Sequence, residues 1–404
     1  MALAEESIRQ AEGRVAESRA AFLPDLESSV QERRQTTNLR AFGFTFTFPT
    51  IPGVPAFVIP NIVGPFTVFD ARATAQQSVF SFSDIRKHQS NRTSLAATRS
   101  DFDATKDQVS NDVARKYLAC LRADATEATA RANVELSDAL LQQAQRLKSA
   151  GTGTGIEVTR AQVQLANDRQ KLIAAVNDRS RSVFELLKAM GLRLDAQVDF
   201  TDKLDYHQAD ASSIEAELGR AKKTRAELRA QQQREEAARL SFGSVKAERL
   251  PSVAASADYG TIGQQLVGAQ PTYTLGIAVK VPVFDGGKRE ARRGESFSQY
   301  QQEKVRTRDL EDQIELEVRT AIDSLRSAAS EVDAAREGLA LAESELAQAR
   351  RRYDAGVGTS VEVTDAQTRL QRARDNQTAA LYSHNLARLD LASATGTIRE
   401  FVNQ

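Results

Sequence analysis

The stretch AGTGTGIEVTRAQ at residues 150–162 returns later in the chain as AGVGTSVEVTDAQ at residues 355–367. The offset between the two copies is 205 residues (356 − 151), and it continues without a gap on both sides of them. It pairs Val113 with Val318, Leu136 with Leu341, Leu141 with Leu346, Leu165 with Leu370 and Gly191 with Gly396. A repeat of this length in constant register indicates a tandem duplication.

Proline marks where helices can run, because it breaks helix interiors and central strands. All nine prolines fall within residues 24–65 and 251–282, and the remaining long segments are rich in strong helix formers. Apolar residues recur there at alternating spacings of three and four, which predicts helices packed as in a coiled coil. The expected seam consists of Val332, Ala335, Leu339, Ala342, Leu346, Ala349 and Tyr353, and of Val363, Ala366, Leu370, Ala373, Gln377 and Ala380.

The two proline-containing windows alternate instead of recurring every three or four residues. The odd positions of residues 275–283 are apolar, whereas the even positions of residues 272–280 are small or polar. Residues 69–76 alternate in the same way. Both windows therefore predict strands with one apolar face and one polar face.

Together these patterns predict a mainly α protein with a small β part, built from two copies of a helix-strand-strand-helix unit. The first structural repeat is expected at residues 1–205, with a partial first helix, strands at about 22–42 and 67–83, and helices at about 84–149 and 156–190. The second is expected at residues 206–404, with a helix at about 212–241, strands at about 249–265 and 271–285, and helices at about 287–354 and 360–396.

An apolar loop separates the first pair of expected strands. It begins with FTFTFP at residues 44–49 and continues through Pro52, Pro55, Pro60 and Pro65. Two interpretations stay open, a surface loop or a loop that lies near lipid headgroups.

Residue usage argues against several functional classes. Lys plus Arg and Asp plus Glu number 54 each, so no basic surplus is available to bind a nucleic acid. Cys120 is the single cysteine, and His88, His207 and His384 are far apart in the sequence. The glycine-rich residues 151–155 lack the Lys-Ser/Thr of a P-loop. We therefore expect no enzyme, no metal site, no cofactor and no nucleic-acid partner.

The start of the chain carries no recognisable export signal. Residues 1–6 read MALAEE and open directly into an amphipathic pattern, with neither a positively charged n-region nor an apolar h-region. Either the protein is cytosolic, or the chain begins downstream of its export signal. No run reaches the roughly 18 consecutive apolar residues of a spanning helix, which excludes a helical membrane protein.

Four strands are too few to close a membrane barrel, which needs at least about eight strands and an even number of them. Because open sheet edges cannot face lipid, three chains with twelve strands are the expected assembly. Residues 83–148 would span on the order of 100 Å as one helix at 1.5 Å per residue. This length suits a tube that extends from a membrane barrel across a periplasmic gap.

The chain resembles the TolC-like outer-membrane factor (outer membrane efflux protein) family over essentially its whole length. The resemblance rests on the duplication, on Leu-Pro at residues 23–24 and 250–251, on VFDGG at residues 283–287, and on the paired A-G-x-G-T-x-x-E-V motifs. It implies a homotrimer with a 12-stranded β-barrel in the outer membrane of a Gram-negative bacterium and a 12-helix α-barrel in the periplasm. The polar strand faces, with Asp70, Arg72, Gln76 and Lys280, would then line the lumen.

The resemblance also implies a function. Members of the family are passive exit ducts of tripartite efflux pumps or type I secretion systems. They bind a periplasmic adaptor protein and, through it, an inner-membrane transporter, and their barrels contact outer-membrane lipid. A soluble or periplasmic coiled-coil scaffold is the alternative, and it leaves the two amphipathic strand pairs unexplained.

The two repeated motifs are expected to be helical turns that contact the adaptor. The contact residues implied by the resemblance are Gly151, Thr152, Gly153 and Thr154 in the first turn and Gly356, Val357, Gly358 and Thr359 in the second. Helix reversal within a few residues needs positive φ angles, so the geometry of the turn explains the glycines equally well.

Glu362 and Asp365 follow the second turn and lie three apart, on one helix face. The resemblance places them at the periplasmic aperture, where three copies would form a ring of carboxylates. Acids at a helix start also favour the positive end of the helix dipole, and the repeat partner Glu157 fits this simpler interpretation. Asp365 is matched by Arg160, so the copies differ there. Ser360 stands where some family members carry a locking arginine, and Arg160 or Arg352 could replace it.

Overall fold

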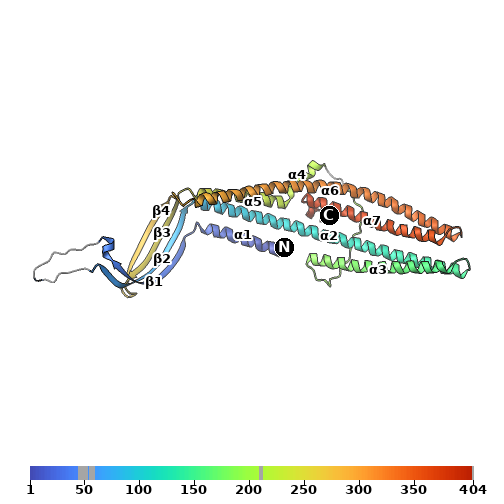
Figure 1. The fold of residues 1–404 in the computed structure, drawn as a ribbon, viewed down its shortest axis with the longest axis horizontal. Helices are drawn as coiled ribbons and strands as arrows, with labels where there is room; N and C mark the ends of the chain where they lie inside the picture. The colour runs from blue at the N-terminus through green and yellow to red at the C-terminus, as the bar shows by residue number, and fades with distance from the viewer. Residues whose placement is uncertain (44–52, 54–59, 209–212, 403–404) are drawn as a thin grey trace. The chain divides into compact units, whose positions relative to one another are not determined.

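The computed structural model describes residues 1–43, 53, 60–208 and 213–402, so most of the loop expected at residues 44–65 lies outside the described residues. Long helices and four strands follow each other along the chain (Figure 1). The elements are α1 (Ala2–Ala20), β1 (Asp25–Asn38), the 3-10 turn η1 (Leu39–Phe42), β2 (Ile62–Phe80), α2 (Phe82–Ser149), α3 (Gly155–Met190), α4 (Ile214–Thr224), α5 (Ala226–Ala247), β3 (Ser252–Gly263), β4 (Gln270–Lys280), α6 (Lys288–Asp354), α7 (Ser360–Ala394) and α8 (Ile398–Val402).

The predicted fold class, mainly α with a small four-stranded part, is confirmed. None of the helices in the described part of the chain is long and apolar enough to cross a membrane. Two compact units form, one from Met1–Ala4, Arg99–Gln231 and Arg306–Gln404, the other from Glu5–Thr98 and Gln232–Val305. Each unit takes residues from both halves of the chain, because helices of one half pack on helices of the other. The predicted division into repeats 1–205 and 206–404 therefore does not describe compact bodies, and it stays a prediction.

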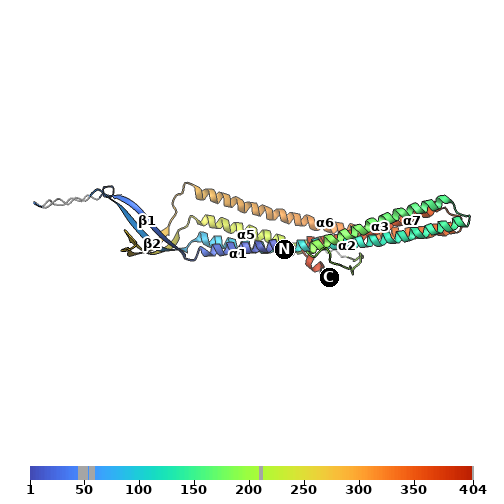
Figure 2. The same ribbon diagram turned by 90° about the horizontal axis from the view of Figure 1, so that it is seen from below.

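The second unit contains a four-stranded antiparallel sheet in the order β1-β2-β3-β4. Figure 2 shows β1 following α1 and β2 leading into α2. β2 begins at Ile62 instead of the expected residue 67, so Pro65 lies inside the strand. It is tolerated there because the register shifts at this point, between Gln35 and Thr37 of β1, and a bulge leaves a residue outside the ladder.

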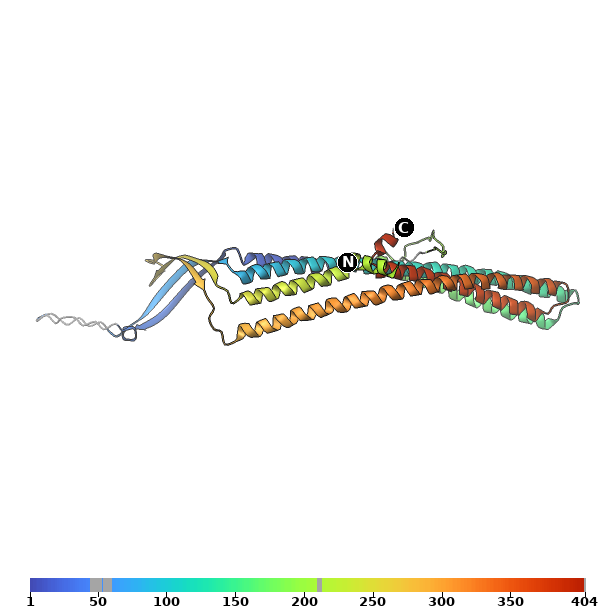
Figure 3. The ribbon, with the colours of Figure 1, turned by 90° about the horizontal axis from the view of Figure 1, so that it is seen from above.

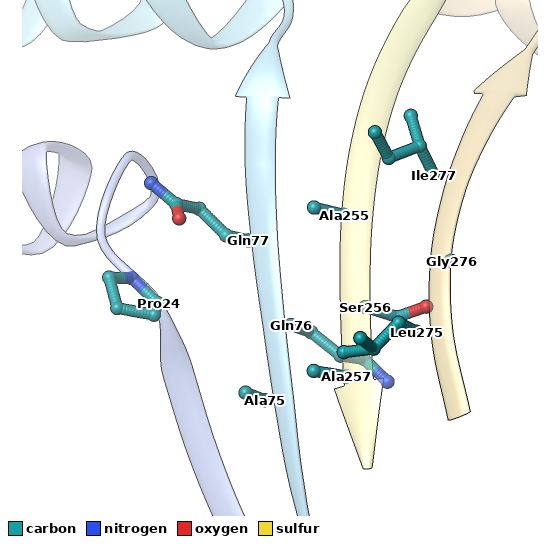
Figure 4. A pocket seen from close by; sticks show the side chains of 10 residues that line it. All are labelled: Pro24, Ala75, Gln76, Gln77, Ala255, Ser256, Ala257, Leu275, Gly276 and Ile277. Carbon is teal, nitrogen blue, oxygen red and sulfur yellow. The ribbon is translucent and has the colours of Figure 1, made fainter. Parts of the chain in front are cut away.

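Register places apolar residues of all four strands in rows on one face of the sheet. Leu26, Ala75, Ala257 and Leu275 form one such row, and Figure 4 shows the last three on neighbouring strands. The large members of this face are open to the surroundings, since Leu26 is 76% and Leu275 74% exposed. The face is therefore apolar, as the alternation predicts, and its large side chains are exposed in the described part of the chain.

The opposite face carries charged groups that pair across strands. The Arg72 guanidinium donates to Asp70, with nitrogen–oxygen distances of 2.8 and 2.9 Å, and lies 3.3 Å from Asp258 on the next strand. Gln31 of β1 donates to Asp70 at 3.4 Å. These contacts link polar side chains of β1, β2 and β3.

The first unit packs its helices through alanine- and leucine-rich seams. Buried Ala342, Leu346 and Ala349 of α6 meet Val363, Ala366 and Leu370 of α7, and Leu136 and Leu140 of α2 pack against the same cluster. This confirms the seam expected from the spacing of three and four. A second cluster joins α4, α5, α6 and α7 around Ala221, Leu228, Ile314, Val318, Ala321, Ile322 and Ala394.

One helix prediction needs correction. The helix expected at about 212–241 is two helices, α4 and α5, because Arg225 adopts an extended backbone between them. The Arg225 guanidinium forms ion pairs with Glu317 of α6 and with Glu227. The Arg225 backbone also lies close to Gly396, where an added Cβ atom would fit only if its neighbours shifted. The helix expected at about 360–396 is α7, which ends at Ala394, and a turn then leads to the short α8, which is not among the expected helices.

Candidate functional site

The two glycine-rich turns close the α2–α3 and α6–α7 hairpins at the same end of the first unit (Figures 1 and 3). In the first turn, the amides of Thr152 and Gly153 donate to the carbonyl of Leu147 at 3.1 and 2.9 Å. In the second turn, the amides of Val357 and Gly358 donate to the carbonyl of Arg352, both at 3.0 Å. The two turns thus have the same backbone hydrogen bonds.

Each turn needs two glycines for different reasons. Gly151 and Gly356 have φ angles of 76° and 75°, which residues with a Cβ rarely adopt. At Gly153 a Cβ atom would lie 2.9 Å from the amide nitrogen of Lys148, and at Gly358 it would lie 3.0 Å from the Cβ of Arg352. The glycines are therefore explained by turn geometry, whether or not a partner contacts them.

The side chains that follow the turns behave differently in the two copies. Glu157 accepts a hydrogen bond from the Thr154 amide at 2.8 Å, which completes a capping box at the start of α3. Its counterpart Glu362 instead accepts from the Nε of Arg352 at 3.3 Å. The counterpart of Arg352 in the first copy is Leu147, which offers no such partner.

The structure places Glu362 and Asp365 on the first turns of α7, both exposed. Arg160, the counterpart of Asp365, is also exposed. Of the two arginines proposed as locks from sequence, Arg352 contacts Glu362. The role of Glu362 and Asp365 at an aperture stays a prediction, as does adaptor contact by residues 151–154 and 356–359.

A buried polar cluster that the sequence pattern did not predict lies on α2, α3 and α7, the helices that lead to these turns. Asp168 of α3 is only 1% exposed, and it contacts Ser137 of α2 and Gln371 of α7. A signal was available, because the 205-residue offset aligns Asp168 with Ala373, a predicted seam position. A carboxylate at a seam position is unusual enough to single out.

Among the described residues, no group of three or more His, Cys, Asp and Glu side chains could hold a metal ion. Cys120 is buried, and burial raises the pKa of its thiol to about 11, which keeps it protonated at neutral pH. His384 is buried and its Nε2 lies 2.9 Å from the carbonyl oxygen of His207. Both side chains are therefore packed in the interior of the helices' contacts.

The chain belongs to the outer membrane efflux protein family, whose model matches residues 1–192 and 218–397. The family consists of outer-membrane channels rather than enzymes. The sequence resemblance to this family is therefore confirmed.

Curated relatives and solved structures agree with this assignment. The chain is 24% identical to the pyoverdine export outer membrane protein OpmQ of Pseudomonas putida, over 98% of this chain and 82% of that protein. It is also 24% identical to the outer membrane protein TolC of Vibrio cholerae, over 74% of this chain and 70% of that protein. Its fold matches the outer membrane protein VceC of Vibrio cholerae with a TM-score of 0.80 at 19% identity, over 98% of this chain and 92% of that one.

Proposed function

We propose that three copies of this outer membrane efflux protein form the exit duct of a tripartite pump. The observation that carries the proposal is the sheet, whose apolar face is exposed and whose order leaves β1 and β4 at its two edges. Unpaired strand edges cannot face lipid, so the edges of one chain must pair with those of another. Twelve strands from three chains would close the barrel.

A second exposed apolar surface supports self-association of the helices. Ile156, Val163, Ile173 and Phe184 lie at heptad positions a and d of α3 and are 52 to 73% exposed. A seam of this kind suits a helix of a neighbouring copy. The helices of three copies would then form the wall of a tube.

The first test is localisation and mass. The chain would be expressed behind an export signal, and inner and outer membranes would be separated. We expect outer-membrane material that runs in detergent near 130 kDa, about three times 44.2 kDa once the detergent contribution is subtracted. A soluble monomer or dimer would contradict the proposal and favour the coiled-coil scaffold.

We further propose that Glu362 and Asp365 form the acidic aperture of this duct. Three copies of each would place six carboxylates around the mouth, and such rings favour cations. The variant Glu362→Ala with Asp365→Ala should lower the cation-to-anion permeability ratio in planar-bilayer recordings. Glu157→Ala, which removes the matching acid of the first copy, is the control and should change this ratio less.

The turns themselves are the proposed adaptor contacts. Val357 is 69% exposed at the second turn, which gives an apolar side chain that a partner could cover. In a Cys120→Ala background, single cysteines at Thr152 or Val357 should cross-link to the periplasmic adaptor of the same organism. The control is a cysteine at Leu3, which is exposed and lies at the start of α1, away from the turns in the sequence. Equal cross-linking at Leu3 would argue against docking at the turns.

A further inference from the structure

The carboxylate of Asp168 is buried among donors from three helices. The Ser137 hydroxyl of α2 donates to its Oδ2, and the Nε2 of Gln371 in α7 donates to its Oδ1 at 3.0 Å. The Nε2 of Gln164, one turn earlier in α3, lies 3.2 and 3.1 Å from the two oxygens. All these bonds are donated to Asp168, which suits an ionised, acceptor-only carboxylate.

A second layer of hydrogen bonds holds the donors in place. The Nε2 of Gln367 donates to the Ser137 hydroxyl at 2.6 Å, so α7 contacts the cluster at two points one turn apart. The Nζ of Lys171 donates to the Oε1 of Gln371 at 3.3 Å and lies 4.0 Å from Asp168. Ser137 and Gln367 are each 1% exposed, so water cannot replace these bonds in place.

The second copy shows that helix packing here does not require such a cluster. The 205-residue offset aligns Ser137 with Ala342 and Asp168 with Ala373, and it aligns Gln371 with Ala166. Ala342 and Ala373 belong to the apolar seam between α6 and α7. Removing a carboxylate from water is costly unless its partners are well placed, and a buried polar group is best attested as a device that fixes one arrangement among several.

The position of the cluster indicates which arrangement it fixes. Gln367 follows Asp365 by two residues on α7, so the proposed aperture acids lie directly below the point where α7 is bonded to α2 and α3. Asp168 lies thirteen residues after the start of α3 at Gly155, or roughly 20 Å along the helix.

We propose that Asp168 is a positioning residue of the duct, which holds α7 to the α2–α3 hairpin and so sets the position of Glu362 and Asp365. This inference rests on the proposed function.

The test replaces three residues of the cluster with alanine, the residue that stands at the aligned position of the other copy. The full chain with Ser137→Ala, Asp168→Ala and Gln371→Ala would be purified as the trimer and compared with the unmodified chain in planar bilayers. We expect assembly to persist and the open probability of the resting channel to rise about tenfold, the size of effect expected from losing hydrogen bonds to a charged group. Conductance and selectivity identical to those of the unmodified chain would overturn the inference.

Controls separate positioning from general stability. Leu165→Ala removes a buried side chain of α3 and leaves a cavity, but it keeps every residue of the cluster. It should therefore lower the midpoint of thermal unfolding without changing the open probability. If the triple variant does not assemble, Gln371→Ala alone removes the direct bond between α7 and Asp168, and it must raise the open probability for the inference to stand. Absence of channels from the unmodified chain would instead overturn the proposed function.

Discussion

The α2–α3 and α6–α7 hairpins have the same turn but different interiors. Their turns share positive-φ glycines at Gly151 and Gly356 and the same backbone hydrogen bonds. The second hairpin packs through an apolar seam, whereas the first contributes a buried carboxylate to its contact with α7. The two copies of the motif therefore share the backbone geometry of the turn but differ in the polarity of the side chains behind it.

The glutamate that follows the turn has a different partner in each copy. Glu157 caps its own helix, whereas Glu362 pairs with Arg352 across the turn. The difference can be traced to one position, because Leu147 stands where the second copy has Arg352. The second copy therefore holds its acid by a contact that can be broken without uncapping a helix.

The largest expected difference between the hairpins lies in their apolar packing. Leu346 is buried in the α6–α7 seam, whereas its counterpart Leu141 is only half-buried. Leu346→Ala should cost about 2 to 5 kcal/mol of unfolding free energy, the range for fully buried leucines, and Leu141→Ala clearly less. Urea titration followed by circular dichroism measures both, and equal losses would contradict the asymmetry of the seams.

Alkaline pH should destabilise the fold through two titratable side chains of α2. Burial and the hydrogen bond to Asp202 raise the pKa of Tyr117 to about 12, and burial raises that of Cys120 to about 11. Because both pKa values are higher in the folded chain, the folded state keeps protons that the unfolded state loses, and stability falls as pH rises from about 9 to about 12. The counterparts in α6 are Ile322 and Leu325, which do not titrate.

Tyr117→Phe with Cys120→Ala should flatten this part of the pH profile. The midpoint of thermal unfolding, followed between pH 8 and pH 12, measures the effect. An unchanged slope in the double variant would show that other groups control alkaline unfolding.

The shared turn geometry predicts equal effects at paired glycines. Gly151→Ala and Gly356→Ala each place a Cβ atom at a φ near 75°, with an expected cost of about 1 to 2 kcal/mol. Gly13→Ala in the middle of α1, where an added Cβ meets nothing within 4 Å, is the control and should not destabilise. Unequal losses of unfolding free energy at the two turns, measured by the same titration, would contradict the prediction that the turns are structurally equivalent.

The smallest expected effect concerns the two glutamates. Glu157→Ala removes half of a capping box and should cost about 1 kcal/mol. Glu362→Ala removes an exposed ion pair and should cost between about 0 and 1 kcal/mol. Thermal unfolding of the two variants, each compared with the unmodified chain, ranks these losses, and a larger loss at Glu362 would contradict the contacts described here.

Much of the fold could be predicted because its signals are local. Glycine spacing located both turns, and the seam spacing of three and four identified Leu346 and Leu370 as buried. Boundaries that depend on distant partners were missed. The break at Arg225 coincides with contacts to Glu317 and Gly396, which are far along the chain.

By itself the sequence determined the duplication, the helical and strand periodicities, the family and the alternating faces of the sheet, because each is written in the spacing of neighbouring residues. Only the tertiary structure decided that Arg352 contacts Glu362 and that Asp168 lies among donors from α2 and α7. These contacts join side chains from separate helices. Their hydrogen bonds depend on angles and distances that no spacing along one helix specifies.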